Sequence, residues 1–296
     1  MAGIPMDQRD GWIWFDGEMV PWKDAKVHVL THGLHYASCV FEGQRAYGGE
    51  VFKLTQHSER LVESGRLLDM PSPYTVAEIN QACRDVLAKN NLVDAYMRPV
   101  MWRGSEEMGI VGKNNRAHVA IAAWEWPSYF TREERLKGIK LTIAEWRRPD
   151  PRTIPSKAKA AGLYMICTLS KHAAMNKGFT DAMMLDYRGY VAEATGANIF
   201  FHKNGELHTP TPDCFLNGLT RQTVIGLARD AGLKVVERHI MPGELGDFDE
   251  CFLTGTAAEL TPVSQIDEAH YTPGRVTSLL IDAYADAVQP KKQAAE

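Results

Sequence analysis

The stretch AMMLDYRGYVAEATGANIFFHKNGELH, residues 182–208, does most to decide the expected fold. Its apolar residues form four short runs. The dipeptides Arg188-Gly189 and Asn204-Gly205 that separate some of them are turn signals, because glycine adopts positive φ without steric cost. We therefore expect a meander of short strands at residues 182–186, 190–194, 199–202 and 206–208.

The segments on either side of this meander alternate between helix and strand patterns. Upstream, a proline-rich loop leads into a helix that Gly178 ends, so Lys159 is expected at a helix entrance. The strands expected on the two sides cover residues 139–146, 234–240 and 250–253, and the helices cover residues 160–177, 220–230 and 275–287.

The N-terminal part of the chain carries its own α and β signals. An alternating pattern around Asp16-Gly17 predicts an opening hairpin, and Gly48-Gly49 predicts a second turn between strands. Thr75 and Glu78 form a capping box at the start of a helix. The expected strands cover residues 12–22 (the hairpin), 40–47, 50–54, 95–102 and 118–126, and a further helix covers residues 56–68.

The length of 296 residues exceeds the usual size of one domain. Residues 127–138 are polar and charged and lack strand periodicity, which is typical of a connection between domains. We expect an α+β protein with a small N-terminal α/β domain at residues 1–127, an interdomain loop at 128–138 and a larger C-terminal domain at 139–296.

The composition argues against several functional classes. The formal net charge of −4 is spread along the chain and forms no basic stripe for nucleic acid. No apolar run reaches the roughly 18 residues of a membrane helix, and the first residues lack the apolar stretch of a secretion signal, so we expect a cytoplasmic protein. The five cysteines show no C-x-x-C spacing and no H-E-x-x-H pattern occurs, so neither disulfides nor a metal site are expected.

Two segments have the features of anion sites. Residues 217–220 open a helix, and residues 254–258 form a turn of small residues after a strand. Unpaired N–H groups at a helix N-terminus attract phosphate. The alternative is that Thr220 is only an N-cap and Gly255 only a turn residue. No G-x-x-x-x-G-K-[ST], G-x-G-x-x-G or G-x-S-x-G motif is present, so the usual nucleotide-binding loops and the serine-hydrolase elbow are missing.

Lys159 is the candidate nucleophile of the sequence. A desolvated lysine forms Schiff bases with carbonyl compounds, and the small residues around Lys159 would let a bulky planar group approach the backbone. The alternative from local sequence is that Lys157 and Lys159 are two solvated lysines before a helix.

Several motifs together resemble the signature of the class IV, fold-type IV aminotransferases that use pyridoxal 5′-phosphate (PLP). The cofactor motifs are residues 159–164 (KAAGLY), 186–200 (DYRGYVAEATGANIF), 216–221 (LNGLTR) and 254–262 (TGTAAELTP). Residues 27–36 (VHVLTHGLHY), 41–43 (FEG) and 96–99 (YMRP) resemble its branched-chain branch. The resemblance covers residues 12–287 and implies a pseudo-barrel for the C-terminal domain.

The resemblance also implies roles for single residues. Lys159 would be the catalytic residue, which binds the cofactor and then moves the proton between the substrate α-carbon and the cofactor C4′. Glu193 would pair with the pyridine nitrogen, Tyr164 would hydrogen-bond the phenolic oxygen and Leu216 would press on the ring. The phosphate would be held by Arg60, Leu219, Thr220 and Thr256.

For the substrate, the resemblance implies one site with two kinds of contact. Tyr36, Tyr96 and Arg98 would receive carboxylates, with Arg98 suited to the distal carboxylate of glutamate. An apolar wall for leucine, isoleucine or valine would comprise Phe41, Ile110, Trp126, Ala257 and Ala258. Two departures concern the substrate range: Gln44 stands where the family commonly has an aliphatic residue, and the loop 102–108 is unusually charged.

The expected activity is therefore amino transfer between branched-chain L-amino acids and 2-oxoglutarate. The alternative keeps the fold but changes the chemistry, to an aminodeoxychorismate lyase or an aminotransferase for D-amino acids or amines. Because family sites are completed by a neighbouring subunit, we expect a homodimer or higher homo-oligomer, with residues of segments 27–41 and 96–110 reaching across. No nucleic acid or membrane partner is expected.

Overall fold

The computed structural model describes residues 4–126, 133 and 136–290. It divides into two compact units. The first contains the chain up to Pro127, with Ala158–Gly162 and the segment that begins at Pro290, and the second contains Ser128–Lys157 and Leu163–Gln289. Most of the expected connection at residues 128–138 lies outside the described residues, so its boundaries stay a prediction.

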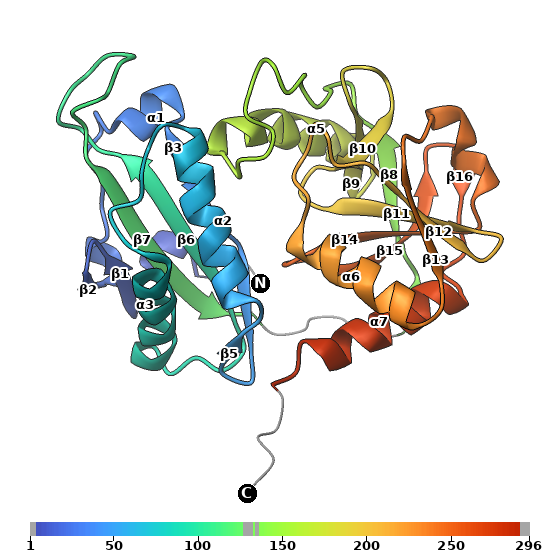
Figure 1. The fold of residues 1–296 in the computed structure, drawn as a ribbon, viewed down its shortest axis with the longest axis horizontal. Coiled ribbons are helices and arrows are strands. Elements are labelled where there is room, and N and C mark those ends of the chain that lie inside the picture. Colours follow the sequence, from blue (N-terminus) through green and yellow to red (C-terminus); the bar gives the residue numbers. More distant parts are fainter. Residues whose placement is uncertain (1–3, 127–132, 134–135, 291–296) are drawn as a thin grey trace, which may run out of the picture. The chain divides into compact units, whose positions relative to one another are not determined.

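The first unit is an antiparallel sheet with helices on one face (Figure 1). The strand order is β2-β1-β7-β6-β4-β5, and β3 also pairs with β6. The strands are β1 (Trp12–Phe15), β2 (Glu18–Pro21), β3 (Cys39–Phe41), β4 (Gln44–Tyr47), β5 (Glu50–Val51), β6 (Ala95–Arg103) and β7 (Ala117–Glu125). The helices are α1 (His32–Tyr36), α2 (Leu54–Leu67) and α3 (Val76–Lys89), with short 3-10 turns η1 (Met6–Gln8) and η2 (Trp22–Asp24).

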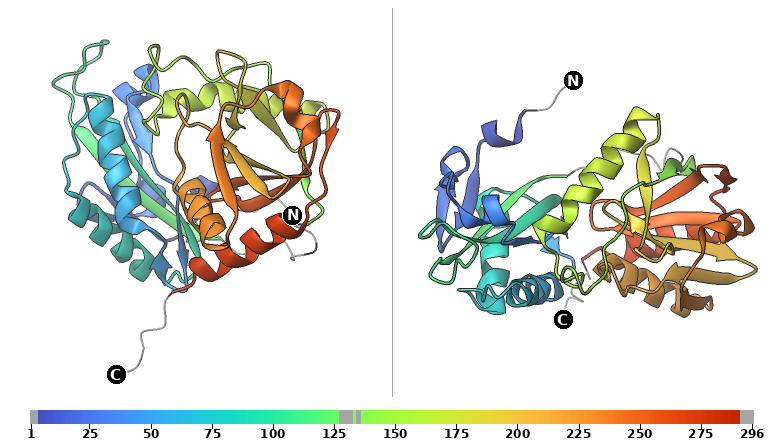
Figure 2. Two further views of the ribbon diagram at one scale, coloured as in Figure 1. Left: turned by 45° about the vertical axis from the view of Figure 1, so that its right-hand side comes forward. Right: turned by 90° about the horizontal axis from the view of Figure 1, so that it is seen from above.

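The second unit is built on a closed barrel, which Figure 2 shows from two sides. Six strands in the order β10-β9-β8-β15-β14-β11 close because β10 pairs with both β9 and β11. The strands are β8 (Ile139–Ile143), β9 (Asp181–Leu185), β10 (Val191–Ala194), β11 (Asn198–Lys203), β12 (Glu206–Pro210), β13 (Lys234–Arg238), β14 (Glu250–Gly255), β15 (Glu259–Ile266) and β16 (Ala269–His270). The helices are η3 (Ala161–Tyr164), α5 (Met165–Asn176), α6 (Leu219–Asp230), η4 (Pro242–Asp247) and α7 (Arg275–Ala287).

The core of the second unit supports this barrel. Its buried cluster includes Leu141, Ile199 and Val263 from three of the barrel strands. The rings of Phe201 and Phe248 stack with centroids 4.8 Å apart. The expected α+β class and the barrel are thus confirmed, and none of the described helices is long and apolar enough to cross a membrane.

Three local expectations were wrong. The helix expected from residue 160 begins only at Met165, because Ala160 pairs with Val40 and a 3-10 turn follows, so Lys159 lies in a loop and not at the entrance of an α-helix. The strand expected at 40–47 breaks between β3 and β4 at Glu42 and Gly43. Strand β15 was not expected, because it contains Pro262, and proline rarely occupies a central strand.

Candidate active site

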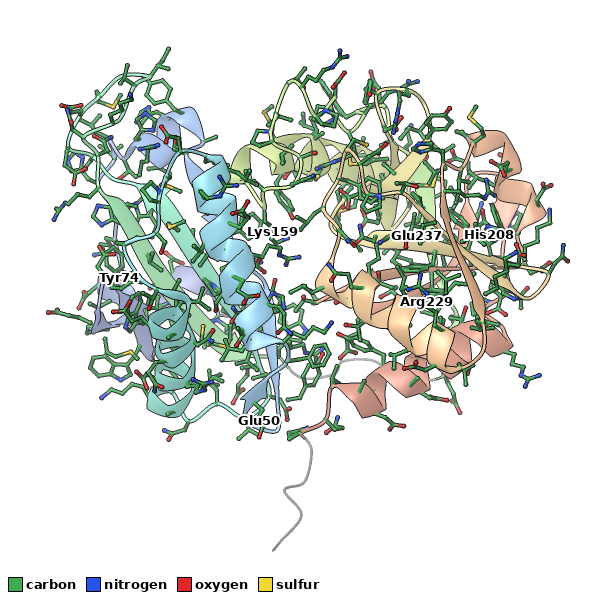
Figure 3. The ribbon with its side chains drawn as sticks, viewed as in Figure 1. Glu50, Tyr74, Lys159, His208, Arg229 and Glu237 are labelled. Atoms are coloured by element: carbon green, nitrogen blue, oxygen red, sulfur yellow. The ribbon has the colours of Figure 1, made fainter. Side chains whose placement is uncertain are left out.

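Lys159 is labelled in Figure 3, and its backbone N–H and carbonyl are both held by contacts within the first unit. The Lys159 N–H donates to Ser64 Oγ on α2 at 3.0 Å, and the Lys159 carbonyl accepts from the Phe41 N–H at 3.1 Å. The Lys159 Nζ lies 4.9 Å from the centroid of the Phe41 ring. The small neighbours have a packing role as well, since Ala158 and Ala160 are buried.

Arg60, expected at the phosphate, belongs to a buried charged group on the same unit. Its Nε donates to Glu42 Oε1 at 2.6 Å and its Nη2 donates to Glu42 Oε2 at 2.8 Å. His57 Nδ1 lies 2.7 Å from Glu42 Oε2. Burial alone would raise the pKa of Glu42, but the charge and hydrogen bonds of Arg60, with His57, outweigh it and hold that pKa at about 2. Glu42 is therefore an anion.

Four of the residues expected at the substrate lie together. Arg98 Nη2 donates to the Tyr96 hydroxyl at 3.0 Å, and the guanidinium carbon lies 4.8 Å from the Phe41 ring centroid. The rings of Tyr96 and Trp126 are 5.2 Å apart. Arg98 Nε is buried and finds no hydrogen-bond partner among the described residues. An arginine held by aromatic rings with an unused buried N–H is suited to a carboxylate.

Tyr36 and Ile110, also expected at the substrate, project to solvent. Tyr36 is 41% exposed at the end of α1, and Ile110 is 83% exposed on the loop between β6 and β7. His32 connects the two segments, because its Nε2 lies 2.9 Å from the Gly109 carbonyl and its ring is 4.7 Å from that of Tyr36. His32 itself is buried.

On the second unit, Glu193 lies in a row of paired residues across the barrel wall. Glu193 on β10 is opposite Asn198 on β11, which is opposite Thr254 on β14. Directly paired residues project from the same face of a sheet. Asn198 Nδ2 donates to Glu193 Oε2 at 3.2 Å. One carboxylate oxygen is thereby oriented by an amide.

The other Glu193 oxygen faces a buried cation. Arg148 Nε lies 3.3 Å from Glu193 Oε1, and the Arg148 side chain is 5% exposed. Burial alone would lower the pKa of Arg148, but the charge of Glu193, together with the neighbouring Cys167, Tyr164 and Cys214, outweighs this and raises it. Arg148 Nη1 also donates to the Leu163 carbonyl at 3.4 Å, next to Tyr164 at the end of η3. The pair fixes Glu193 as a hydrogen-bond acceptor.

The two expected phosphate segments have the geometry of an anion site. Helix α6 begins at Leu219 and Thr220, and Gly218 is its N-cap without a side-chain cap. Asn198 contributes here too, because its Oδ1 accepts from the Gly218 N–H at 3.1 Å and its Nδ2 donates to the Leu216 carbonyl at 3.0 Å. A helix N-terminus without a capping side chain offers N–H donors and a favourable dipole to an anion.

The second of these segments is the hairpin turn between β14 and β15, which consists of Thr256, Ala257 and Ala258. It follows Gly255, where a Cβ would come within 3.4 Å of the Gly196 carbonyl oxygen. β14 also packs against α6. The Thr254 hydroxyl is buried and has no hydrogen-bond partner within the described ranges. The turn and the helix start are thus carried by neighbouring elements of one unit.

Sequence reasoning missed three residues that hold the expected ones in place: Glu42, Arg148 and Asn198. Glu42 and Asn198 stand inside quoted motifs, so an ionisable or amide side chain between apolar neighbours was the available signal. Arg148 had no such signal. At the departure Gln44, the side chain is fully buried and accepts from Cys83 Sγ on α3 at 3.4 Å.

The charged side chains of the loop 102–108 bind groups in the same segment between β6 and β7. Arg103 is buried and donates to the Gly112 carbonyl at 3.0 Å, and Glu106 binds Arg116 at 2.9 Å. Asn115 donates to the carbonyls of Gly104 and Glu107. These bonds give the charges of Arg103 and Glu106 partners within the same segment.

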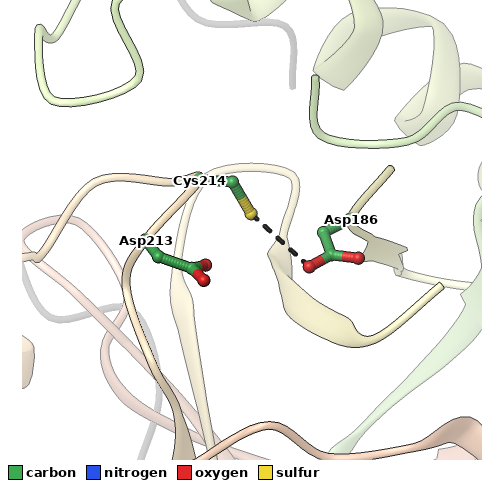
Figure 4. Close-up of side chains that lie close together, drawn as sticks. All are labelled: Asp186, Asp213 and Cys214. Carbon is green, nitrogen blue, oxygen red and sulfur yellow. Dashed lines mark hydrogen bonds between the residues drawn. The ribbon is translucent and has the colours of Figure 1, made fainter. Parts of the chain in front are cut away.

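A separate acidic cluster comprises Asp186, Asp213 and Cys214 (Figure 4). Arg188 Nη2 binds Asp186 Oδ2 at 2.6 Å and Asp213 Oδ2 at 2.8 Å. The Cys214 thiol faces Asp186 Oδ2 at 3.8 Å, and burial raises the pKa of this thiol to about 12. The carboxylates are paired with a cation of the chain itself, so we assign the cluster a structural role beside the turn at Gly189.

Comparisons with known proteins give relatives over nearly the whole chain. The family model described as amino-transferase class IV matches residues 39–266. The branched-chain-amino-acid aminotransferase of Pseudomonas aeruginosa is 44% identical over 98% of this chain and 97% of its own length. The structure of the branched-chain aminotransferase of Thermoproteus uzoniensis with norvaline has a TM-score of 0.90 at 35% identity, covering 95% of each chain. The structure of the branched-chain amino acid aminotransferase of Thermobaculum terrenum in its PLP form has a TM-score of 0.86 at 32% identity, covering 94% of each chain.

Proposed function

The chain belongs to the class IV aminotransferases, and we propose that it transfers amino groups between branched-chain L-amino acids and 2-oxoglutarate with PLP as cofactor. The products are branched-chain 2-oxo acids and L-glutamate. The observation that carries the proposal is the linked set of Glu193, Asn198 and the start of α6, in which one amide orients a carboxylate and a helix N-terminus together.

This set fits the two ends of the cofactor. The Glu193 side chain is 12% exposed and already paired with Arg148, so it is suited to accept a hydrogen bond from a protonated pyridine nitrogen. The residues that would hold the phosphate are Arg60, Leu219, Thr220 and Thr256, with Tyr164 at the phenolic oxygen and Leu216 at the ring. Bound PLP supplies a ring that takes up electrons when the substrate α-proton leaves.

Lys159 is the protein group that would take part directly in the chemical step. Its amine would hold the cofactor by condensing with the cofactor aldehyde, with loss of water, and, once freed by the substrate amine, it would take the proton from the substrate α-carbon and deliver it to C4′. The bonds from Ser64 and Phe41 hold the Lys159 backbone, so only the side chain has to move. One residue therefore serves two steps without rearrangement of the chain.

Arg98 and the aromatic residues around it would bind the substrate. Arg98 and Tyr96 would bind carboxylates, and the buried Arg98 Nε is the donor that a carboxylate satisfies. Phe41 and Trp126 would contribute to the apolar wall for the aliphatic side chain, with Ala257 and Ala258. Tyr36 and Ile110, which are exposed in the single chain, would join the carboxylate contact and the wall by reaching across from the neighbouring subunit. Glutamate and leucine would share the site because the charged contact lies beside apolar rings.

We propose a homodimer as the working unit, located in the cytoplasm. The supporting observation is a set of exposed apolar residues on the two segments expected to reach across, which comprises Val27, Val29, Leu30, Leu34, Met108 and Ile110. Large exposed apolar side chains gathered in this way are typical of an interface. All five cysteines are free and four are buried, which suits a reducing compartment.

The test is an assay of full-length protein with added PLP, L-leucine and 2-oxoglutarate, in which glutamate is measured. We expect glutamate with leucine, isoleucine and valine as donors, and none from Lys159→Ala. Lys157→Ala is the matched control, because Lys157 is exposed and two residues away. Higher activity with D-alanine and pyruvate, or release of pyruvate from aminodeoxychorismate, would replace the proposal by one of the alternatives.

A further inference from the structure

We propose that Glu42 is a positioning residue for the cofactor phosphate: it fixes the guanidinium of Arg60 in the orientation in which Arg60 meets that phosphate. The inference rests on the proposed function, because Arg60 is assigned to the phosphate only there. The proposed function by itself gives Glu42 no role.

The contact between the two side chains determines the orientation of Arg60. Glu42 is 0% exposed, and its two oxygens bind Nε and Nη2 of Arg60 at 2.6 and 2.8 Å. A two-point bond of this kind fixes both the plane and the rotation of a guanidinium. His57 holds the carboxylate from a third direction at 2.7 Å. With its Nε and Nη2 edge on Glu42, Arg60 would meet the phosphate through its Nη1 side.

The position of Glu42 is set by the elements that also hold Lys159. The Glu42 N–H donates to the Pro99 carbonyl at 2.8 Å, while the preceding Phe41 N–H donates to the Lys159 carbonyl. On α2, Ser64 lies one helical turn after Arg60 and accepts from the Lys159 N–H. Arg60 and Lys159 are therefore held at a fixed separation, which a cofactor bound at its aldehyde and at its phosphate requires.

If only charge mattered, Glu42 would weaken the binding of the phosphate by Arg60 and not strengthen it. The low pKa of Glu42 means that its carboxylate is ionised, and burial lowers the pKa of His57, which favours a neutral imidazole. Glu42 then cancels the charge of Arg60. Removing the carboxylate would leave Arg60 more attractive to a phosphate if only charge mattered. The sign of the change on substitution thus separates positioning from electrostatics.

The experiment compares PLP with pyridoxal, which lacks the phosphate. Cofactor-free full-length protein is titrated with each compound, and the visible absorbance of the lysine-bound cofactor gives the two dissociation constants. The ratio of the dissociation constant for pyridoxal to that for PLP reports the contribution of the phosphate alone. For Glu42→Gln we expect the ratio to fall on the order of 10-fold, with pyridoxal affinity unchanged, as is usual when the residue that orients a ligand-binding group is lost.

A double-mutant cycle shows whether Glu42 acts through Arg60. Arg60→Met should lower the ratio, and adding Glu42→Gln to it should have no further effect. A ratio that is unchanged or higher in Glu42→Gln, or an additive loss in the double variant, would overturn the inference. An unchanged ratio in Arg60→Met would overturn it as well while leaving the aminotransferase assay intact. A wild type without phosphate preference and without transamination would instead refute the proposed function.

Two further variants exclude a general loss of structure. Glu250→Gln removes another buried carboxylate, which accepts from the N–H groups of Gly274, Val276 and Thr277 at the start of α7. It should leave the ratio unchanged, and a matching fall would overturn the inference. Glu42→Asp keeps the charge but shortens the reach. If Glu42→Gln does not fold, the ratio must fall in Glu42→Asp instead, and an unchanged ratio there would count against positioning.

Discussion

Asn198 lies directly opposite Glu193 on the neighbouring barrel strand, and its amide donates to the Glu193 carboxylate at 3.2 Å. The same amide binds Leu216 and Gly218 at the entrance of α6. One side chain therefore joins the proposed contact of the pyridine nitrogen to the proposed contact of the phosphate. The spacing between these two contacts is built into the barrel wall.

Replacing Asn198 tests this connection. Asn198→Ala removes three hydrogen bonds, so we expect kcat to fall on the order of 10- to 100-fold and the free energy of unfolding to fall by about 1–3 kcal/mol. Asn198→Asp should lower kcat further, because a second carboxylate then faces Glu193. Steady-state kinetics and urea unfolding measure both effects. Equal kcat in wild type and Asn198→Ala would rule out a role of Asn198 at the site.

Lys159→Ala should abolish both turnover and the visible absorbance of bound cofactor, because it removes the amine that binds the aldehyde. The fold should persist, since the contacts with Ser64 and Phe41 use only the Lys159 backbone. Absorbance spectroscopy and circular dichroism measure the two properties. Lys157→Ala is the control that should keep both, and turnover in Lys159→Ala above background would disprove the assignment.

Gly43→Ala should disturb substrate binding through Tyr96. A Cβ at Gly43 would collide with the Tyr96 hydroxyl, which accepts from Arg98. Relief of such a clash costs about 1–3 kcal/mol, so we expect KM for 2-oxoglutarate to rise with a smaller change in kcat. Gly226→Ala on α6 is the control, because a Cβ there meets no atom within 4 Å. An unchanged KM for 2-oxoglutarate in Gly43→Ala would show that Tyr96 does not contribute to carboxylate binding.

Glu42 should contribute a pH-dependent part of the stability. Its folded pKa of about 2 lies below the unfolded value of about 4.3, so the contribution is present above that unfolded value and is lost as the pH falls toward 2. The difference in unfolding free energy between wild type and Glu42→Gln should shrink by about 3 kcal/mol over this range. Denaturant unfolding from pH 6 down to about pH 3 follows the first part of this loss, about 2 kcal/mol for the fall from pH 4.3 to pH 3. A difference independent of pH would mean that Glu42 is not an anion in the fold.

The sequence patterns predicted much of the fold because its signals are local. The glycine turns at Gly189 and Gly205 and the capping box at Thr75 all appear as expected. The failures have non-local causes. Ala160 pairs with Val40, some 120 residues earlier in the chain, and this pairing draws Lys159 out of the helix that its own neighbourhood favours.

The candidate site was predicted through the resemblance, and its supporting residues were not. Lys159 and Glu193 stand in motifs that carry the family signature, whereas Arg148 acquires its role only when β8 and β10 are brought into one barrel. Glu42 is similar: an acid between Phe41 and Gly43 has no distinction until burial against Arg60 gives it a partner. Tertiary pairing of distant charges is not encoded in local spacing.

The half-reaction with a single donor tests the central claim most directly. PLP-loaded protein is mixed with L-leucine in the absence of any oxo-acid acceptor, and the branched-chain 2-oxo acid is quantified against the amount of bound cofactor. Our account predicts one molecule of oxo acid per cofactor site, a matching loss of the visible absorbance, and its return when 2-oxoglutarate is added. No oxo acid from L-leucine, L-isoleucine or L-valine, or a larger yield from D-alanine, would contradict it.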